Sequence, residues 1–406
     1  MIEKRDRGSA VITVSTDGSC LSNPGGAIGW AWINHDGSFD SGGAASGTNQ
    51  VAELTALLQA VRAHPGADPL LIESDSQYAA HGSDGGGSIR IPASACGLVG
   101  LKPSRGRVSP GPLSVDGAGL ATHGVLTRSV RDTAAFLDVL ARPWPGDTFV
   151  AGPVAGTTPR GGAATWWTGE APVSFLAATG AATRPLRVGL LLDPVVAPGA
   201  PVHPACVAAA RETATLLAGM GHDVVEVGPP FDAERWDAFA ALWSVGALTA
   251  PVPAQDEERL VPLTRWLRER GRATSGLEYA TALAGVQALT RDVATAWADV
   301  DVVVSPTLAQ LPAPVGTQRL DDDPAADFAA QTAFTPWTSM WNLTGRPAVS
   351  LPLGEAVVPD DAGAPVTLPV GVMLGAAHGA DALLLALAAR LEEAAPWAHR
   401  RPPETS

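Results

Sequence analysis

The first 79 residues admit few folds, because their local patterns follow the order strand, strand, strand, helix, strand. Residues 10–17 (AVITVSTD) form a β-branched run that ends in an acid, and residues 27–33 (AIGWAWI) form a second strand-type run before an Asp-Gly turn signal. Residues 50–63 (QVAELTALLQAVRA) have the apolar spacing of an amphipathic helix, and residues 70–75 return to a strand pattern. This order predicts a β-β-β-α-β unit.

Three acids occupy informative places in this unit. Asp17 and Asp75 end predicted strands, and Glu53 lies in the first turns of the predicted helix. If the first and fourth strands are neighbours, the three carboxylates meet, and such a cluster is stabilised by a hard cation such as Mg²⁺ or Mn²⁺. The alternative is that each acid is a strand-end or capping residue. The spacing alone leaves both interpretations open.

The wording of these segments adds a family resemblance. TDGSCLSNPGGAIGWAW, TNQVAELTALLQAV and IESDSQY, within residues 12–78, resemble type I ribonuclease H. The resemblance implies metal-dependent hydrolysis of the RNA strand in RNA–DNA hybrids, with Mg²⁺ or Mn²⁺ bound by Asp17, Glu53 and Asp75. It also implies contacts from Asn23 and Gln50 to the hybrid. The family's basic helical region, fifth strand and fourth metal-binding aspartate have no counterpart in the residues that follow.

The charge of the chain opposes binding to nucleic acid. Residues 1–79 hold four basic side chains against nine acidic ones, a net charge of −5, and the whole chain has a net charge of −14. A negative field repels phosphate backbones. No run approaches the ~18 uninterrupted apolar residues of a membrane span, and no apolar signal-peptide core follows the charged start. We expect a cytoplasmic protein without a membrane partner.

A glycine-rich segment begins the second part of the chain. Residues 81–107 read HGSDGGGSIRIPASACGLVGLKPSRGR. A serine after three glycines is most simply a flexible linker. The apolar run that follows favours another interpretation, a tight turn in which backbone N–H groups converge beside the serine hydroxyl to form an oxyanion hole.

This segment resembles the core of the amidase-signature family. HGVLTRSVRDTAAFLDVL, ADVDVVVSPTLAQLPAPVG, FTPWTSMWNLTGRPAVSLPLG and LPVGVMLGAAHGADALLLALAARLE, all further along the chain, extend the resemblance to residue 392. It implies an α/β/α domain around a mixed sheet that hydrolyses carboxamides through an acyl-enzyme, with a Ser–cis-Ser–Lys triad and no cofactor. Ser88 matches the nucleophile, and the matching oxyanion-hole loop is Asp84, Gly85, Gly86 and Gly87.

One departure from the family pattern affects catalysis. The family's catalytic lysine and bridging serine lie upstream of the serine motif, where this chain has ribonuclease-like residues. The lysines of the sequence are Lys4, in a charged segment, and Lys102, which matches a non-catalytic family lysine. A serine hydroxyl is a weak nucleophile until a base removes its proton. We therefore expect slow or no reaction of Ser88 with a fluorophosphonate.

These observations predict two domains, a truncated ribonuclease H-like segment over residues 1–79 and an incomplete amidase-signature domain over residues 80–406. The predicted function is an amidase-type serine hydrolase of small-molecule amides, impaired by the absent lysine and serine. Two alternatives stay open. One is a ribonuclease H that acts on RNA–DNA hybrids, and the other is an inactive fusion of two incomplete domains. The sequence gives no oligomeric state.

Overall fold

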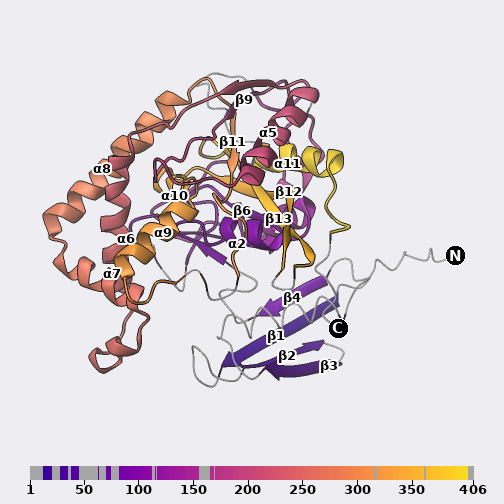
Figure 1. Ribbon diagram of the computed structural model, residues 1–406. Coiled ribbons are helices and arrows are strands. Elements are labelled where there is room, and N and C mark those ends of the chain that lie inside the picture. Colours follow the sequence, from indigo (N-terminus) through magenta and orange to yellow (C-terminus); the bar gives the residue numbers. More distant parts are fainter. Residues whose placement is uncertain are drawn as a thin grey trace. The chain divides into compact units, whose positions relative to one another are not determined.

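The computed structural model describes residues 12–20, 28–34, 38–44, 63, 70–74, 82–111, 115, 117–154, 165–168, 170–314, 317, 319–360 and 363–400. The chain divides into two compact units, Met1–Ser83 and Asp84–Ser406, which are drawn in Figure 1 and are described separately below.

The Met1–Ser83 unit contains a four-stranded sheet in the order β3-β2-β1-β4. Strand β1 pairs antiparallel with β2 and parallel with β4, so the first and fourth strands are neighbours, which is the condition for the three carboxylates to meet. The helix expected over residues 50–63 lies outside the described residues except for Ala63, which is helical. The strands are β1 (Ile12–Cys20), β2 (Ile28–Asn34), β3 (Phe39–Ala44) and β4 (Leu70–Ser74).

The prediction that Asp17 ends its strand is wrong. Strand β1 continues to Cys20, and Asp17 lies opposite Ala31 of β2 in the antiparallel ladder. Asp, Gly and Ser have low strand propensity, but the main-chain ladder with β2 holds residues 17–20 extended. Asp17 is therefore part of the strand interior.

The Asp84–Ser406 unit is built on a seven-stranded mixed sheet in the order β10-β9-β11-β13-β12-β6-β8. Strands β10, β9 and β11 are parallel, and each later pair in this order is antiparallel. The mixed sheet expected for this part of the chain is confirmed. Its strands are β6 (Val99–Lys102), β8 (Leu126–Thr127), β9 (Arg187–Leu190), β10 (Asp223–Glu226), β11 (Val302–Pro306), β12 (Ala348–Pro359) and β13 (Pro365–Ala376).

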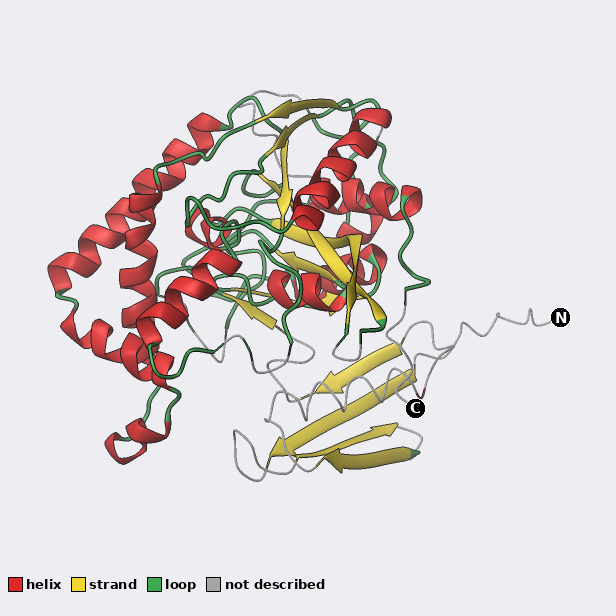
Figure 2. Cartoon of the chain, in the orientation of Figure 1, coloured by secondary structure: helices red, strands yellow, loops and turns green. Residues whose placement is uncertain are grey.

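Helices pack against both faces of this sheet (Figure 2). Central strands are buried on both sides, so that Val302 and Val304 join one apolar cluster and Val303 joins the other. The first cluster includes side chains of α3 (Val130–Leu140), α4 (Phe175–Ala178), α5 (Pro204–Gly219) and α11 (Asp381–Ala394). The second includes side chains of α6 (Asp237–Thr249), α8 (Gly276–Ala296) and α10 (Ser339–Thr344). The unit is a three-layer α/β/α structure.

The remaining elements are short or peripheral. Helix α7 packs against α6 and α9. Among the described residues, no helix combines the length and apolar character needed to cross a membrane. The bounds are β5 (Gly82–Asp84), α2 (Arg90–Cys96), β7 (Thr122–Gly124), α7 (Pro262–Ala273), α9 (Pro324–Phe334) and two 3₁₀ helices, Ala233–Trp236 and Ala254–Arg259.

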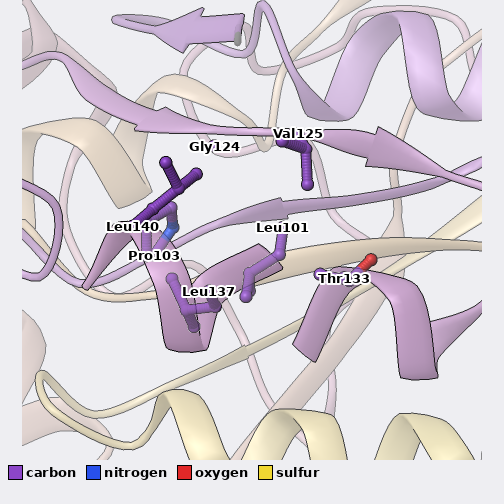
Figure 3. Close-up of a pocket in the computed structure, with 7 residues that line it drawn as sticks. All are labelled: Leu101, Pro103, Gly124, Val125, Thr133, Leu137 and Leu140. Atoms are coloured by element: carbon purple, nitrogen blue, oxygen red, sulfur yellow. The ribbon is translucent and has the colours of Figure 1, made fainter. Parts of the chain in front are cut away.

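A small cavity lies between β6, the turn after β7 and α3 (Figure 3). Apart from Thr133, its lining is apolar, and the Thr133 hydroxyl is hydrogen-bonded to Thr127 and to the backbone oxygen of Ser129. We assign it to the packing of α3 on the sheet. Its lining residues are Leu101, Pro103, Gly124, Val125, Thr133, Leu137 and Leu140.

Candidate active site

The predicted nucleophile lies on a tight loop between β5 and α2. Ser88 is exposed, whereas Gly85 and Gly87 are buried beneath it. Gly87 has a φ of 138°, and a Cβ there would lie 2.5 Å from Ile91 Cδ1 and 2.9 Å from Thr338 Oγ1. Only glycine fits this backbone and this space. The Gly-Gly-Gly-Ser segment is therefore a closely packed turn and not a linker.

A fully buried ion pair anchors both ends of this loop. Asp84 and Arg90 have no exposed side-chain surface, and their bidentate contact joins Oδ1 to Nη2 at 2.9 Å and Oδ2 to Nε at 3.0 Å. Oδ2 also accepts from the backbone N–H of Ile89 at 3.2 Å. The carboxylate before the glycines is thus tied to the first turn of α2, which brings the loop back on itself.

Asn342 of α10 completes the hydrogen bonds of this buried pair. Its Nδ2 donates to the backbone oxygen of Asp84 at 2.6 Å, to Asp84 Oδ1 at 2.9 Å and to the backbone oxygen of Leu120 at 3.0 Å. Its Oδ1 accepts from Arg90 Nη2 at 2.7 Å. One amide side chain therefore connects three separate segments, as a satisfied buried polar network requires.

Thr338, the residue before α10, contacts the same loop. Its hydroxyl donates to the backbone oxygen of Gly86 at 2.8 Å, and its own backbone oxygen accepts from Arg90 Nη1 at 2.8 Å. The segment at the start of α10 therefore holds the glycine loop at Gly86 and the first turn of α2 at Arg90.

The charges of this network shift the pKa of two buried groups. Burial alone would raise the pKa of the Asp84 carboxyl. The charge and hydrogen bonds of Arg90, together with the charge of Lys102, outweigh the effect of burial and lower this pKa to about 2. Lys102 is fully buried in β6, and its amine donates to the backbone oxygen of Pro103 at 2.9 Å. Burial and the Arg90 charge lower the pKa of Lys102 to about 7. Asp84 is thus a permanent anion, and Lys102 is largely neutral above pH 7.

Aromatic rings of α6 pack directly on the loop. A Cβ at Gly85 would lie 2.9 Å from Trp243 Cζ3, and a Cβ at Gly86 would lie 3.3 Å from Phe239 Cζ. The two rings stack with centroids 5.2 Å apart, and Phe239 stacks in turn on Trp236 at 5.1 Å. The series continues through Phe328 to Trp266, with centroids 6.0 and 5.7 Å apart. We call these five residues the aromatic stack.

Three other tryptophans belong to the core. Trp166 and Trp337 have no exposed surface, and Trp341 is 1% exposed. Trp341 also packs tightly against Gly375 of β13, where a Cβ would lie 2.2 Å from its ring. These residues contribute to the packing of the two apolar clusters.

The structure describes the two predicted sites unequally. Asp84, the three glycines and Ser88 form one continuous loop. Asp17 lies in β1, where only its backbone is described, and the other predicted metal ligands and hybrid contacts lie outside the described residues: Glu53, Asp75, Asn23 and Gln50. Asn342 and Thr338 were not identified from the sequence as site residues, although both lie in a motif of the amidase resemblance. Trp243 and Phe239 lie in a region without a family motif.

Comparisons with known proteins agree with both resemblances. The Amidase family model matches residues 72–385, and the RNase H family model matches residues 9–85. The chain is 36% identical over 343 residues to the 6-aminohexanoate-cyclic-dimer hydrolase of Paenarthrobacter ureafaciens, which covers 80% of this chain and 64% of that protein. It is 36% identical over 326 residues to the putative amidase AmiB2 of Mycobacterium tuberculosis, which covers 79% of this chain and 62% of that protein.

The solved structures agree with the family model. A structure of 6-aminohexanoate cyclic dimer hydrolase complexed with substrate aligns with a TM-score of 0.67 and 32% identity, over 80% of this chain and 66% of that chain. The chain spans less than two thirds of the length of the two curated relatives named above. The Amidase model nevertheless covers most of its residues, and the seven-stranded mixed sheet matches the solved structures. The chain therefore belongs to the amidase signature family.

Proposed function

We propose that the Asp84–Ser406 unit hydrolyses a small-molecule carboxamide through an acyl-enzyme on Ser88. The observation that carries this proposal is the loop itself, in which an exposed serine follows three glycines whose backbone is held by a buried network of Asp84, Arg90 and Asn342. A nucleophile must be presented at a constant position to approach a carbonyl carbon. The relatives are named as amide hydrolases, which agrees with this chemistry.

The backbone around Ser88 suits stabilisation of an oxyanion. Attack by the serine Oγ on the carbonyl carbon places negative charge on the substrate oxygen, and collapse of the adduct releases the amine and leaves the acyl group on Oγ. The N–H groups of residues 85–88 donate to no other residue that the structure describes. In contrast, the N–H groups of Ile89 and Arg90 are directed at Asp84. We therefore assign the N–H groups of residues 85–88 to the oxyanion, whereas the family resemblance implied the loop of residues 84–87.

Removal of the serine proton limits this reaction. In the family the base is a lysine that acts through a second serine, both upstream of the motif, where residues 9–85 of this chain match RNase H. Lys102 is buried and donates to the backbone oxygen of Pro103. We infer that Ser88 reacts slowly, because solvent hydroxide must replace the missing base.

Labelling by a fluorophosphonate tests this proposal. We expect slow labelling that is lost in Ser88→Ala and retained in Ser83→Ala, a change at another exposed serine of the same segment. The rate should rise about tenfold per pH unit from pH 7 to 9, as expected for reaction through hydroxide. Labelling that persists in Ser88→Ala would contradict the assignment of the nucleophile. No labelling of the wild type would contradict the proposed hydrolysis. A rate that reaches a plateau near neutral pH would show that a base is present.

One observation favours a second function for the Met1–Ser83 unit. The parallel pairing of β1 and β4 ends at Thr16 and Ser74, the residues that precede Asp17 and Asp75. This backbone arrangement fits a site in which the carboxylates of Asp17, Asp75 and Glu53 would hold Mg²⁺ or Mn²⁺, which would polarise a phosphodiester. The net charge of −5 of residues 1–79 opposes binding of the hybrid, so we propose that this unit binds the metal ion without cleaving a hybrid.

A further inference from the structure

We propose that Trp243, backed by Phe239, is the specificity wall of the candidate active site and selects amides that carry an uncharged planar ring next to the carbonyl. This inference rests on the proposed function, because it takes Ser88 as the reacting group. It concerns the part of the substrate that does not react.

The two rings lie close to the nucleophile loop. Gly85 and Gly86 lack side chains, and any Cβ there would meet Trp243 at 2.9 Å or Phe239 at 3.3 Å. The rings therefore pack on the backbone that leads directly into Ser88. An acyl group held near the N–H donors of this loop lies beside the same rings.

The two rings differ in how much of their surface is exposed. Phe239 is 4% exposed and lies between Trp236 and Trp243 in the aromatic stack, so both of its faces are covered. Trp243 is the terminal ring of the stack and is partly exposed. It is thus the ring of this pair that offers surface to a ligand.

Hydrogen bonds from neighbouring residues hold the wall in place. Trp236 Nε1 donates to Ser339 Oγ at 2.8 Å, and the neighbouring Thr338 hydroxyl donates to the backbone oxygen of Gly86 at 2.8 Å. Adjacent residues therefore hold the aromatic stack and the glycine loop. These contacts fix the position of the wall relative to the nucleophile, and selection of a ligand by its shape requires such a fixed position.

The charges near the aromatic stack indicate which ligand charge the wall favours. Arg270 lies 4.8 Å from the ring of Trp266, at the end of the stack opposite to Trp243. The exposed ring at the loop is thus an apolar, polarisable face. Such a face favours an offset-stacked or edge-to-face aromatic ring over a saturated group of equal size.

The experiment measures binding and not turnover, so its result is independent of the rate of Ser88. Benzamide and cyclohexanecarboxamide share the carboxamide and the ring size but differ in planarity. Both are titrated against Ser88→Ala protein by saturation-transfer NMR. We expect benzamide to bind about fivefold more tightly. Trp243→Leu in the same background should abolish this preference, because leucine retains apolar bulk without a flat face, and Trp243→Phe should retain most of it.

The control is Trp144→Ala, which removes a tryptophan that is 50% exposed and outside the aromatic stack, and which should leave the preference unchanged. If Ser88→Ala protein binds cyclohexanecarboxamide as tightly as benzamide or more tightly, the proposal is overturned. This outcome needs no Trp243 variant. A preference for benzamide that survives in folded Trp243→Leu protein would also overturn it. If the fluorophosphonate does not react but the preference for benzamide is intact, the proposed hydrolysis is refuted and the role of Trp243 in binding is retained.

Discussion

The replacement of Lys102 by methionine gives a direct test of the electrostatics beneath the glycine loop. Lys102 has no exposed surface, and its pKa is lowered to about 7 by burial and by the charges of Arg90 and Arg105, against the opposing charges of Asp84 and Asp381. A lysine of this kind favours unfolding whenever the unfolded chain binds a proton that the folded chain does not. Methionine keeps an unbranched apolar side chain and removes the titration.

The magnitude follows from the two pKa values. The pKa is 10.5 in the absence of the fold and about 7 within it, so the unfolded state binds more protons between these limits and stability rises with pH. At about 1.4 kcal/mol per pKa unit, the penalty is about 4 kcal/mol at pH 7 and about 2 kcal/mol at pH 9. The hydrogen bond to Pro103, which methionine cannot make, offsets about 1 kcal/mol of the gain. Lys102→Met should therefore be stabilised by about 3 kcal/mol at pH 7 and about 1 kcal/mol at pH 9.

Urea unfolding followed by tryptophan fluorescence at both pH values measures this difference. The exposed cation Arg142, replaced by methionine, serves as the control and should show the same change at pH 7 and 9. The decisive quantity is the stability of Lys102→Met relative to wild type, which should fall by about 2 kcal/mol between pH 7 and 9. A difference that does not depend on pH would refute the lowered pKa, and with it the described charge balance around Asp84.

Two further predictions address the two candidate sites. Asp84→Asn leaves the buried Arg90 without its carboxylate and should lower the free energy of unfolding by about 3–5 kcal/mol, measured as a lower urea midpoint. Asp132→Asn changes an exposed acid and is the control. An equal decrease of the urea midpoint in Asp132→Asn would contradict the special role of the buried pair. The Met1–Ser83 unit should not cleave an RNA–DNA hybrid in the presence of Mn²⁺, because its negative charge opposes hybrid binding, and a gel assay with the full chain measures this. Cleavage that is abolished by Asp17→Asn would show that expectation to be wrong.

Local patterns sufficed for much of the fold. The β-branched run at residues 10–17 and the strand-type run at residues 27–33 predicted two strands, and the structure has strands at Ile12–Cys20 and Ile28–Asn34. The end of the first strand was misplaced, since Asp17 to Cys20 are held in the ladder by their partners in β2 and not by their own propensity. The serine loop could be identified because its residues are contiguous in the chain.

The sequence by itself determined the two family resemblances, the succession of strand patterns along the first unit and the nucleophile candidate Ser88. Each of these depends on contiguous residues or on local periodicity. The tertiary structure decided what surrounds that serine. Asn342 reaches Asp84 across 258 positions of sequence, and Trp243 reaches Gly85 from a helix without a family motif. Such contacts depend on how helices pack on the two faces of the sheet, and no local pattern records that packing.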